Sequence, residues 1–354
     1  MSIPQPLPSP GRLIASIPGM IGFIPQRSLI LVLIPAGSTD PDRGELAALP
    51  RFDLTDSAAS ILDRLRPLLA KMGSATGFVI VVDDRLPAPG VDGRATSGRD
   101  HRLVEQVVRG LAASPVRVSG TFATVAIVAG GSWWSLSGTT ESGTLPDPAR
   151  TPSARQRAAL GMPVLESRAA LADSLRTDPA LAVPVSAALG GAVAEVRGRR
   201  QAVEHELEMT VRDRRDLEQV LYAIADLADG VTFPPSDLAR LGAVLSIATV
   251  SQCLPAIAIG EHAVAAERLW ILLTRSLTGR YRAEAAVLLA YSAHLRGDGT
   301  LAGLAITVAL EADPTHIFAR LLHAALERAL PPGVVHRFAR FAIAAAADLG
   351  ITIP

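Results

Sequence analysis

The stretch that decides the fold of the first half is residues 17–34, IPGMIGFIPQRSLILVLI. Its second part, Leu29–Ile34, is an unbroken run of branched aliphatic residues that ends at Pro35. A run of this kind, without polar alternation, is typical of a strand buried on both faces of a sheet. The prolines and glycines of residues 17–25 predict a stiff, shaped loop that leads into the strand. Because such a strand needs helices on both sides, the stretch predicts an α/β domain.

The residues that follow continue this pattern. Leu49–Leu54 is a candidate short strand, and Phe78–Val82 is a second fully apolar strand. Between them, Asp56 or Ser57 can cap a helix that runs to about Met72, with leucine and isoleucine at helical spacing on its buried face. Alternating strands and helices of this length favour a sheet with flanking helices.

The end of the first half predicts one more helix and an antiparallel edge. Helical spacing covers about Arg99–Ala112, and strand patterns cover Val116–Val118 and Phe122–Ala129. Gly130-Gly131 then predicts a two-residue turn into Ser132–Leu136, which is typical of a hairpin. We therefore expect a mixed, mostly buried sheet with flanking helices.

After about residue 145 the strand signal disappears and an all-α domain is predicted. The expected division is a flexible Pro-rich tail at 1–12, an α/β domain at 13–145 and a helical domain at 146–354. The segments with helical spacing are Arg168–Leu175, Val185–Val196, Gln201–Leu227, Ser236–Ser251 and Glu261–Leu277. In the segment 201–227, Leu207 and Val211 are expected to face inward.

The clearest helical pattern is the repeat-like unit at 283–314. Small residues occupy the expected helix crossing, Gly297-Asp298 forms the turn, and Asp313-Pro314 ends the second helix. These features resemble one tetratricopeptide-type repeat. No second copy follows at an offset of about 34 residues, and roughly three copies are needed to stack stably. A lone helical hairpin inside the domain is expected, with a peptide-binding superhelix as the alternative.

Composition excludes several classes of protein. Lys+Arg and Asp+Glu both number 34, so the chain lacks the positive field of a general nucleic-acid binder. Cys253 is the only cysteine, which excludes an intrachain disulfide and indicates a small buried residue. No uninterrupted apolar run approaches the roughly 18 residues of a membrane helix, and the N-terminus lacks a signal-peptide pattern. We expect a cytoplasmic protein with neither nucleic acid nor membrane as a partner.

Asp83 and Asp84 are the best chemical hint. They follow a buried strand, at the end where open α/β sheets bind ligands. Paired carboxylates there could hold a metal ion or a sugar hydroxyl, but aspartate is also an ordinary turn former after a strand. Arg27 and Ser28 precede the first strand, at the opposite edge if the strands are parallel, and Ser28 is either a loop cap or a nucleophile. The candidate ligand-binding residues are Arg27, Ser28, Asp53, Asp83 and Asp84.

Catalytic signatures are lacking. The sequence contains no GxxxxGK[ST] loop, no GxSxG elbow and no HxxxH pair. Residues 297–302, GDGTLA, match a dinucleotide fingerprint but follow an apolar helix, so they predict a helix–helix turn. We therefore predict no catalytic residue, no metal site and no cofactor. The candidate partner-binding residues are Trp134, Tyr291 and His294.

A basic group, Arg197, Arg199 and Arg200, lies at the end of a predicted helix beside acidic residues. A solvated surface and a contact with an anion both fit it.

Several motifs together resemble a known family. The pattern Pro18-x-x-x-Gly22-Phe23-x-Pro25-x-x-Ser28-Leu29 leads straight into the apolar strand. The further motifs are Arg51–Leu54, Gly161–Leu171, Leu269-Trp270, Leu288–Pro314, Ala319–Leu322 and Pro331-Pro332. Over nearly the full chain they resemble the actinobacterial family called domain of unknown function 4192. The resemblance implies a two-part architecture and an actinobacterial source, and it implies no activity.

Two functions fit these observations. The first is a non-catalytic interaction or scaffold protein with an unidentified protein partner, a second copy of the chain included. The second is a small-molecule or nucleotide-binding α/β protein, an enzyme among the options, with its ligand at the strand ends near Asp83-Asp84.

Overall fold

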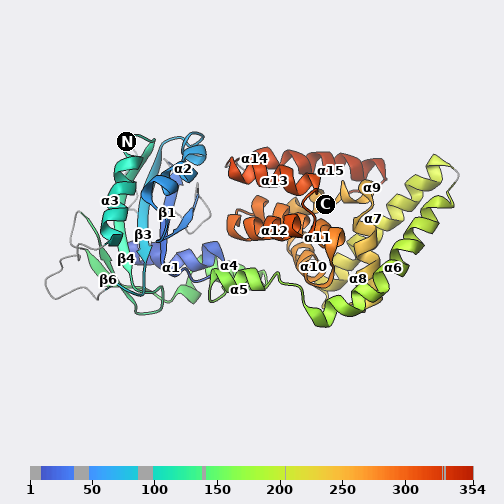
Figure 1. Cartoon of the computed structure of the whole chain (residues 1–354), viewed down its shortest axis with the longest axis horizontal. Helices are drawn as coiled ribbons and strands as arrows, with labels where there is room; N and C mark the ends of the chain where they lie inside the picture. The colour runs from blue at the N-terminus through green and yellow to red at the C-terminus, as the bar shows by residue number, and fades with distance from the viewer. Residues whose placement is uncertain are drawn as a thin grey trace. The chain divides into compact units, whose positions relative to one another are not determined.

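The computed structural model describes residues 9–35, 48–86, 99–137, 141–203, 205–328, 330 and 332–353. The chain forms two compact units, Met1–Leu171 and Ala172–Pro354 (Figure 1). The first unit holds a mixed sheet with flanking helices and the second is helical, so the predicted fold class is confirmed.

The first unit is built on a six-stranded sheet with the order β2-β1-β3-β4-β5-β6. The strands are β1 (Ser28–Pro35), β2 (Arg51–Asp53), β3 (Ala75–Val82), β4 (Val116–Thr124), β5 (Ser132–Ser135) and β6 (Ser142–Thr144). The two fully apolar strands are neighbours, as the sequence requires. They run antiparallel, with Ser28 opposite Val82 and Pro35 opposite Ala75. Only β3 and β4 pair in parallel among these strands.

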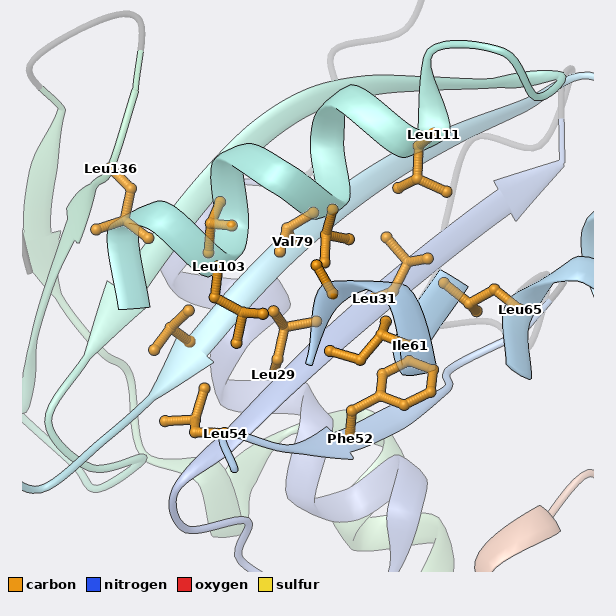
Figure 2. Packing of buried hydrophobic residues seen from close by; sticks show 14 of the residues in the cluster. Leu29, Leu31, Phe52, Leu54, Ile61, Leu65, Val79, Leu103, Leu111 and Leu136 are labelled. Carbon is orange, nitrogen blue, oxygen red and sulfur yellow. The ribbon is translucent and has the colours of Figure 1, made fainter. Parts of the chain in front are cut away.

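Helices cover both faces of the sheet. On one face, α2 (Ala58–Leu69) and α3 (Arg99–Leu111) pack on the odd-numbered side chains of β1 and β3, with Leu31 and Val79 at the centre (Figure 2). The even-numbered side chains point to the other face and are buried as well. Trp133 lies on that second face, close to Gly11 of α1 (Pro10–Ile21). Burial on both faces explains why the centres of β1 and β3, Leu29–Ile34 and Phe78–Val82, contain no polar residue.

The helix α1 stands where the sequence predicted part of a loop and the end of a flexible tail. Pro10 is the first residue of the helix, where the backbone N–H has no partner within the helix, so the missing N–H of proline loses no hydrogen bond. Gly22 ends the helix with φ +85°, a left-handed conformation that glycine adopts without strain. The predicted loop is therefore shortened to residues 22–27, and residues 1–8 of the predicted tail lie outside the described residues.

The predicted hairpin is present, but its turn is longer than expected. Thr124 pairs with Trp133, so residues 125–131 connect β4 to β5 in place of a two-residue turn at 130–131. The Thr124 hydroxyl is within hydrogen-bonding distance of the carbonyl oxygens of Ala126 (3.0 Å) and Ser132 (2.9 Å), which organises this loop. The strands predicted at 116–118 and 122–129 are one strand, β4, which ends at Thr124.

Residues after the sheet remain with the first unit. The helix α4 (Pro152–Ala159) packs on α1, and the Ser153 hydroxyl donates to the Ser16 carbonyl oxygen at 3.0 Å. Gly19 lets the two helices approach, since a Cβ there would lie 2.8 Å from the backbone carbon of Ser153. This packing is why the two units divide after Leu171, within α5 (Arg168–Asp173).

The second unit is a stack of helices. They are α6 (Pro179–Gln201), α7 (Glu206–Ala228), α8 (Pro235–Leu245), α9 (Ala248–Ser251), α10 (Ala263–Ser276), α11 (Gly279–Leu295), α12 (Gly299–Ala312), α13 (Ile317–Glu327), α14 (Pro332–Val335) and α15 (Arg337–Asp348). The helix predicted at 201–227 is split between the end of α6 and α7. Leu207 and Val211 of α7 are exposed, so their predicted inward orientation is wrong.

The hairpin of α11 and α12 lies at the centre of this unit. Gly297, with φ +86°, and Asp298, whose carboxylate accepts the Leu301 N–H at 3.0 Å, form the turn between the two helices. The GDGTLA match is thus the predicted helix–helix turn. Arg296 beside it pairs with buried Glu267 of α10 through two hydrogen bonds of 3.1 and 3.0 Å. A buried carboxylate with this bidentate partner fixes α10 against the end of α11.

The contact between α1 and α4 can be tested by replacing Gly19. The substitution Gly19→Ala forces these helices apart, and we expect it to lower the free energy of unfolding of the first unit by about 1–3 kcal/mol. Urea unfolding in a Trp270→Phe background isolates the fluorescence of Trp133 and Trp134, which both lie in this unit.

The matched control is Gly73→Ala in the same unit. A Cβ on Gly73 meets no atom within 4 Å, and its backbone φ is not left-handed. We expect a change within about 0.5 kcal/mol. Equal destabilisation by the two substitutions would contradict the close packing of α1 on α4.

Candidate functional site

The antiparallel pairing of β1 and β3 gathers the predicted ligand-binding residues at one edge of the sheet. The start of β1 lies beside the end of β3, so Arg27 and Ser28 share an edge with Asp83 and Asp84. The opposite-edge arrangement, expected for parallel strands, does not occur. The neighbouring β2 adds Asp53, which pairs in register with Ser28. We call this group the strand-end cluster; its members are Arg27, Ser28, Arg51, Asp53, Asp83, Asp84, Arg85 and Asp100.

Arg27 and Asp84 form an exposed bidentate pair across the edge. The Nε and Nη2 of Arg27 donate to the two carboxylate oxygens of Asp84 at 2.8 and 3.0 Å. The hydrogen bond from Arg27 lowers the pKa of Asp84. Arg27 has φ +44°, an uncommon conformation for a residue with a Cβ. Its carbonyl oxygen accepts the Leu54 N–H at 3.0 Å, which holds the backbone in this conformation.

Ser28 is buried and holds the loop that precedes β1. Its hydroxyl donates to the Gln26 carbonyl oxygen at 2.6 Å and accepts from Arg51 Nε at 2.8 Å. Arg51 also donates to Asp53 at 2.6 Å. The O–H donor and one acceptor lone pair of the hydroxyl are therefore used by protein groups, an arrangement that matches the loop-cap interpretation of Ser28.

Asp83 is the buried member of the cluster, with a side chain 2% exposed. It accepts hydrogen bonds from the Arg85 backbone N–H at 3.1 Å, from Nε at 2.9 Å and from Nη2 at 2.7 Å, and it contacts Asp100 at the start of α3. Burial alone raises the pKa of Asp83, but the hydrogen bonds from the Arg85 side chain and backbone outweigh it, and the pKa is lowered to about 2. Asp83 is therefore ionised at neutral pH.

The arrangement is one of paired charges. Asp53, Asp83 and Asp84 each have an arginine partner within the cluster. In the part of the chain that the structure describes, no group of three or more His, Cys, Asp or Glu side chains could hold a metal ion. A ligand for these carboxylates would have to displace a guanidinium group. The ligand-binding role of the cluster stays a prediction.

The three residues predicted to bind a partner are buried. Trp134 belongs to the core between the sheet and its helices. Tyr291 is fully buried in the second unit, where its hydroxyl donates to the Val335 carbonyl oxygen at 3.2 Å and burial raises its pKa to about 12. His294 is buried close by in α11, and burial lowers its pKa. None of the three presents a surface that a partner could contact, so a partner surface has to be sought elsewhere.

Cys253 is buried, as predicted. Its thiol donates to the Thr249 carbonyl oxygen at 3.2 Å, and burial raises its pKa to about 11. A thiol with so high a pKa is a poor nucleophile at neutral pH.

Sequence reasoning missed a set of exposed apolar side chains on α13 and α15. Ile317 is 76% exposed, Leu321 54%, Phe338 41% and Phe341 75%. Ile317 and Leu321 are one turn apart on α13, and the Phe318 ring lies 5.5 Å from the Phe338 ring, which joins α13 to α15. We call these four residues the α13–α15 face. The sequence could have indicated this face, because α13 carries apolar residues such as Ile317 and Leu321 in addition to its buried residues Ala319, Leu322 and Ala325.

The composition of helix α6 is a second feature that was not expected from the sequence. Within the described residues it is the one single helix long and apolar enough to cross a membrane by length and composition, and only 22% of its apolar window is buried. One such helix is weak evidence for a membrane span, because core helices of water-soluble proteins also meet these criteria.

Comparisons with known proteins identify a family and nothing closer. Residues 10–333 match the model of a family described as a domain of unknown function (DUF4192). No curated protein and no solved structure matches the chain. The family match includes the whole strand-end cluster and α13, and it ends before α15.

The charge of Asp83 gives the first unit a predictable pH dependence. Since the folded-state pKa, about 2, lies below the ordinary value of 3.8, the ionised carboxylate stabilises the fold above about pH 4. This contribution is lost as the pH falls towards 2. We expect Asp83→Asn to lower the free energy of unfolding by about 1–3 kcal/mol at pH 7 and by much less at pH 2.5. Urea unfolding in the Trp270→Phe background measures both.

Asp84→Asn is the control, because the pair that it breaks is exposed to solvent on both sides. Exposed ion pairs contribute little to stability, so a smaller loss is expected at both pH values. A loss with Asp83→Asn that is the same at pH 7 and pH 2.5 would show that the ionised carboxylate does not stabilise the fold.

Proposed function

Because the chain belongs to the family described as a domain of unknown function (DUF4192), whose name assigns no activity, we propose a function from its own residues. The protein is a non-catalytic interaction protein, and it binds a protein partner through the α13–α15 face. The observation that carries this proposal is the exposure of Ile317, Leu321, Phe338 and Phe341.

Exposed apolar side chains that lie together mark interaction sites more often than isolated ones do. Ile317 and Leu321 form one row on α13, and the ring contact between Phe318 and Phe338 links that helix to α15. Phe341 follows Phe338 by three residues, a spacing that places neighbouring side chains on one side of a helix. A partner that covers these side chains removes a large apolar area from water, and this burial favours association.

Arginine side chains border the apolar residues. Arg320 adjoins Leu321, and Arg340 adjoins Phe341; both are exposed. Among the described residues neither has a carboxylate within 4 Å. Arginine and aromatic side chains supply most of the binding energy at protein–protein interfaces. The composition of the α13–α15 face therefore suits a protein partner.

The alternative function, binding of a small molecule or nucleotide near Asp83-Asp84, has weaker support. Asp83 is held by Arg85, and Asp84 is held by Arg27. A ligand would gain a contact only at the expense of one of these pairs. Binding to the α13–α15 face breaks no ion pair, because its apolar side chains face water.

The proposal is tested by removing apolar area from the α13–α15 face. We expect the tagged wild-type chain, purified from its native host, to recover a stoichiometric protein partner. The double substitution Leu321→Ser and Phe341→Ser should reduce this recovery by at least tenfold, since a central aromatic residue commonly contributes about 2 kcal/mol or more to binding. Light scattering of the purified chain then shows whether the partner is a second copy.

The control is Leu207→Ser, which removes an 82% exposed leucine from α7 of the same unit. It should leave partner recovery unchanged. A wild-type chain that is monomeric and recovers no partner would refute the proposed function. A partner that the double variant and the wild type recover equally would refute the role of this face.

A further inference from the structure

A groove follows α6, and its lining includes none of the four residues of the α13–α15 face. It consists of two adjoining hollows of about 420 and 380 Å³ that share Val193 and Arg197. The lining residues on α6 recur every three or four positions from Ser186 to Gln201. At a rise of 1.5 Å per residue this is a length of about 22 Å. We call this feature the α6 groove.

The walls of the groove come from four helices, α6, α8, α9 and α11. The rest of the lining comes from the start of α11 and from the α8–α9 region: Thr278, Arg280, Tyr281, Ala243, Ser246, Ile247 and Ala248. The apolar part consists mainly of Leu189, Val193 and Ile247. Gly190 opens the groove further, because a Cβ built on it meets no atom within 4 Å. The backbone of a bound segment can therefore approach α6 closely at this point.

Among the described residues, the charge of the lining is positive. Arg197, Arg200 and Arg280 line the groove, and no carboxylate of the described part of the chain does. Arg200 is paired with Asp213, which neutralises it. Arg197 is exposed and, within the described residues, has no carboxylate within 4 Å; Glu195 of the same helix pairs with Arg199 instead.

Arg280 is the second available cation. Its Nη2 donates to the Tyr281 hydroxyl at 2.6 Å, and its guanidinium carbon lies 4.7 Å from the centre of the Tyr281 ring. These neutral contacts orient the guanidinium, and within the described residues no carboxylate lies within 4 Å of it. Its charge also contributes, after the hydrogen bonds with Thr315, to the lowered pKa of Asp313. Arg197 and Arg280 thus present two cations along a groove whose remaining lining is largely apolar.

From this combination we propose that the α6 groove binds an acidic, amphipathic segment of a protein partner. Apolar side chains of the segment lie on Leu189, Val193 and Ile247, and its carboxylates pair with Arg197 and Arg280. Arginine matches a carboxylate with two parallel hydrogen bonds, which fixes the register of the segment. An amphipathic helix in an apolar groove is a recurring mode of peptide recognition.

Other anionic occupants fit the groove less well. A bilayer surface cannot enter a hollow between helices, and the length and apolar composition of α6 are weak evidence for a membrane contact. A nucleic acid needs an extended basic surface, and here the apolar residues outnumber the two available cations.

The test uses a fluorescein-labelled peptide of about 15 residues, the length of helix that spans the groove. It has leucine at helical spacing and glutamate at the other positions. We expect saturable binding to the full chain by fluorescence anisotropy, and no binding of the matched peptide with lysine in place of glutamate. Arg197→Glu and Arg280→Glu together should weaken binding at least tenfold.

Two controls separate this site from the others. Arg155→Glu reverses an exposed arginine on α4 and should leave the affinity unchanged. The double variant Leu321→Ser and Phe341→Ser should also bind the peptide normally, so failure of the proposed function leaves this inference standing. Circular dichroism confirms that each variant is folded.

Three results would overturn the inference. One is equal binding of the glutamate and lysine peptides, and another is wild-type affinity of the charge-reversed variant. The third is that phosphatidylglycerol vesicles or a single-stranded DNA oligonucleotide bind the chain in an Arg197-dependent manner while the glutamate peptide does not.

Discussion

The first unit depends on the antiparallel pairing of β1 with β3, two strands with hardly any polar side chain. Their backbone N–H and C=O groups are buried under helices on both faces and must pair with each other, since water cannot reach them. The register that satisfies them, Ser28 opposite Val82, also sets the position of every neighbouring element. The sheet extends from this pair to β2 on one side and to β4, β5 and β6 on the other.

The strand-end cluster is a direct consequence of that register. Antiparallel strands place the start of one beside the end of the other, so Arg27 meets Asp84 and the buried Asp83 lies one strand away from Ser28. Asp53, Asp83 and Asp84 then each have an arginine partner, and the partner of Asp83 offsets the cost of its burial. The cluster thus stabilises the loops around the strand ends, and three of its carboxylates are already paired with arginines.

The helical unit distributes its polar and apolar groups differently. Inside, Glu267 and Arg296 form a bidentate pair beside the turn of the central hairpin. Outside, apolar side chains remain uncovered on α13 and α15, and the apolar α6 borders a groove with two available arginines. A unit with an ordered core and two such surfaces is suited to holding partners, which is the sense in which a scaffold role is proposed.

The sequence by itself determined the buried strands, the helical second half and the turn at Gly297-Asp298, because uninterrupted aliphatic runs and helix-ending residues are local signals. It also indicated Asp83, Asp84, Arg27 and Ser28 as residues of interest. Only the tertiary structure decided that these four share one edge, because strand direction and register depend on pairing between distant segments. The same holds for burial: Tyr291 and Phe341 are both aromatic residues on helices, and packing alone places the first inside and the second in water.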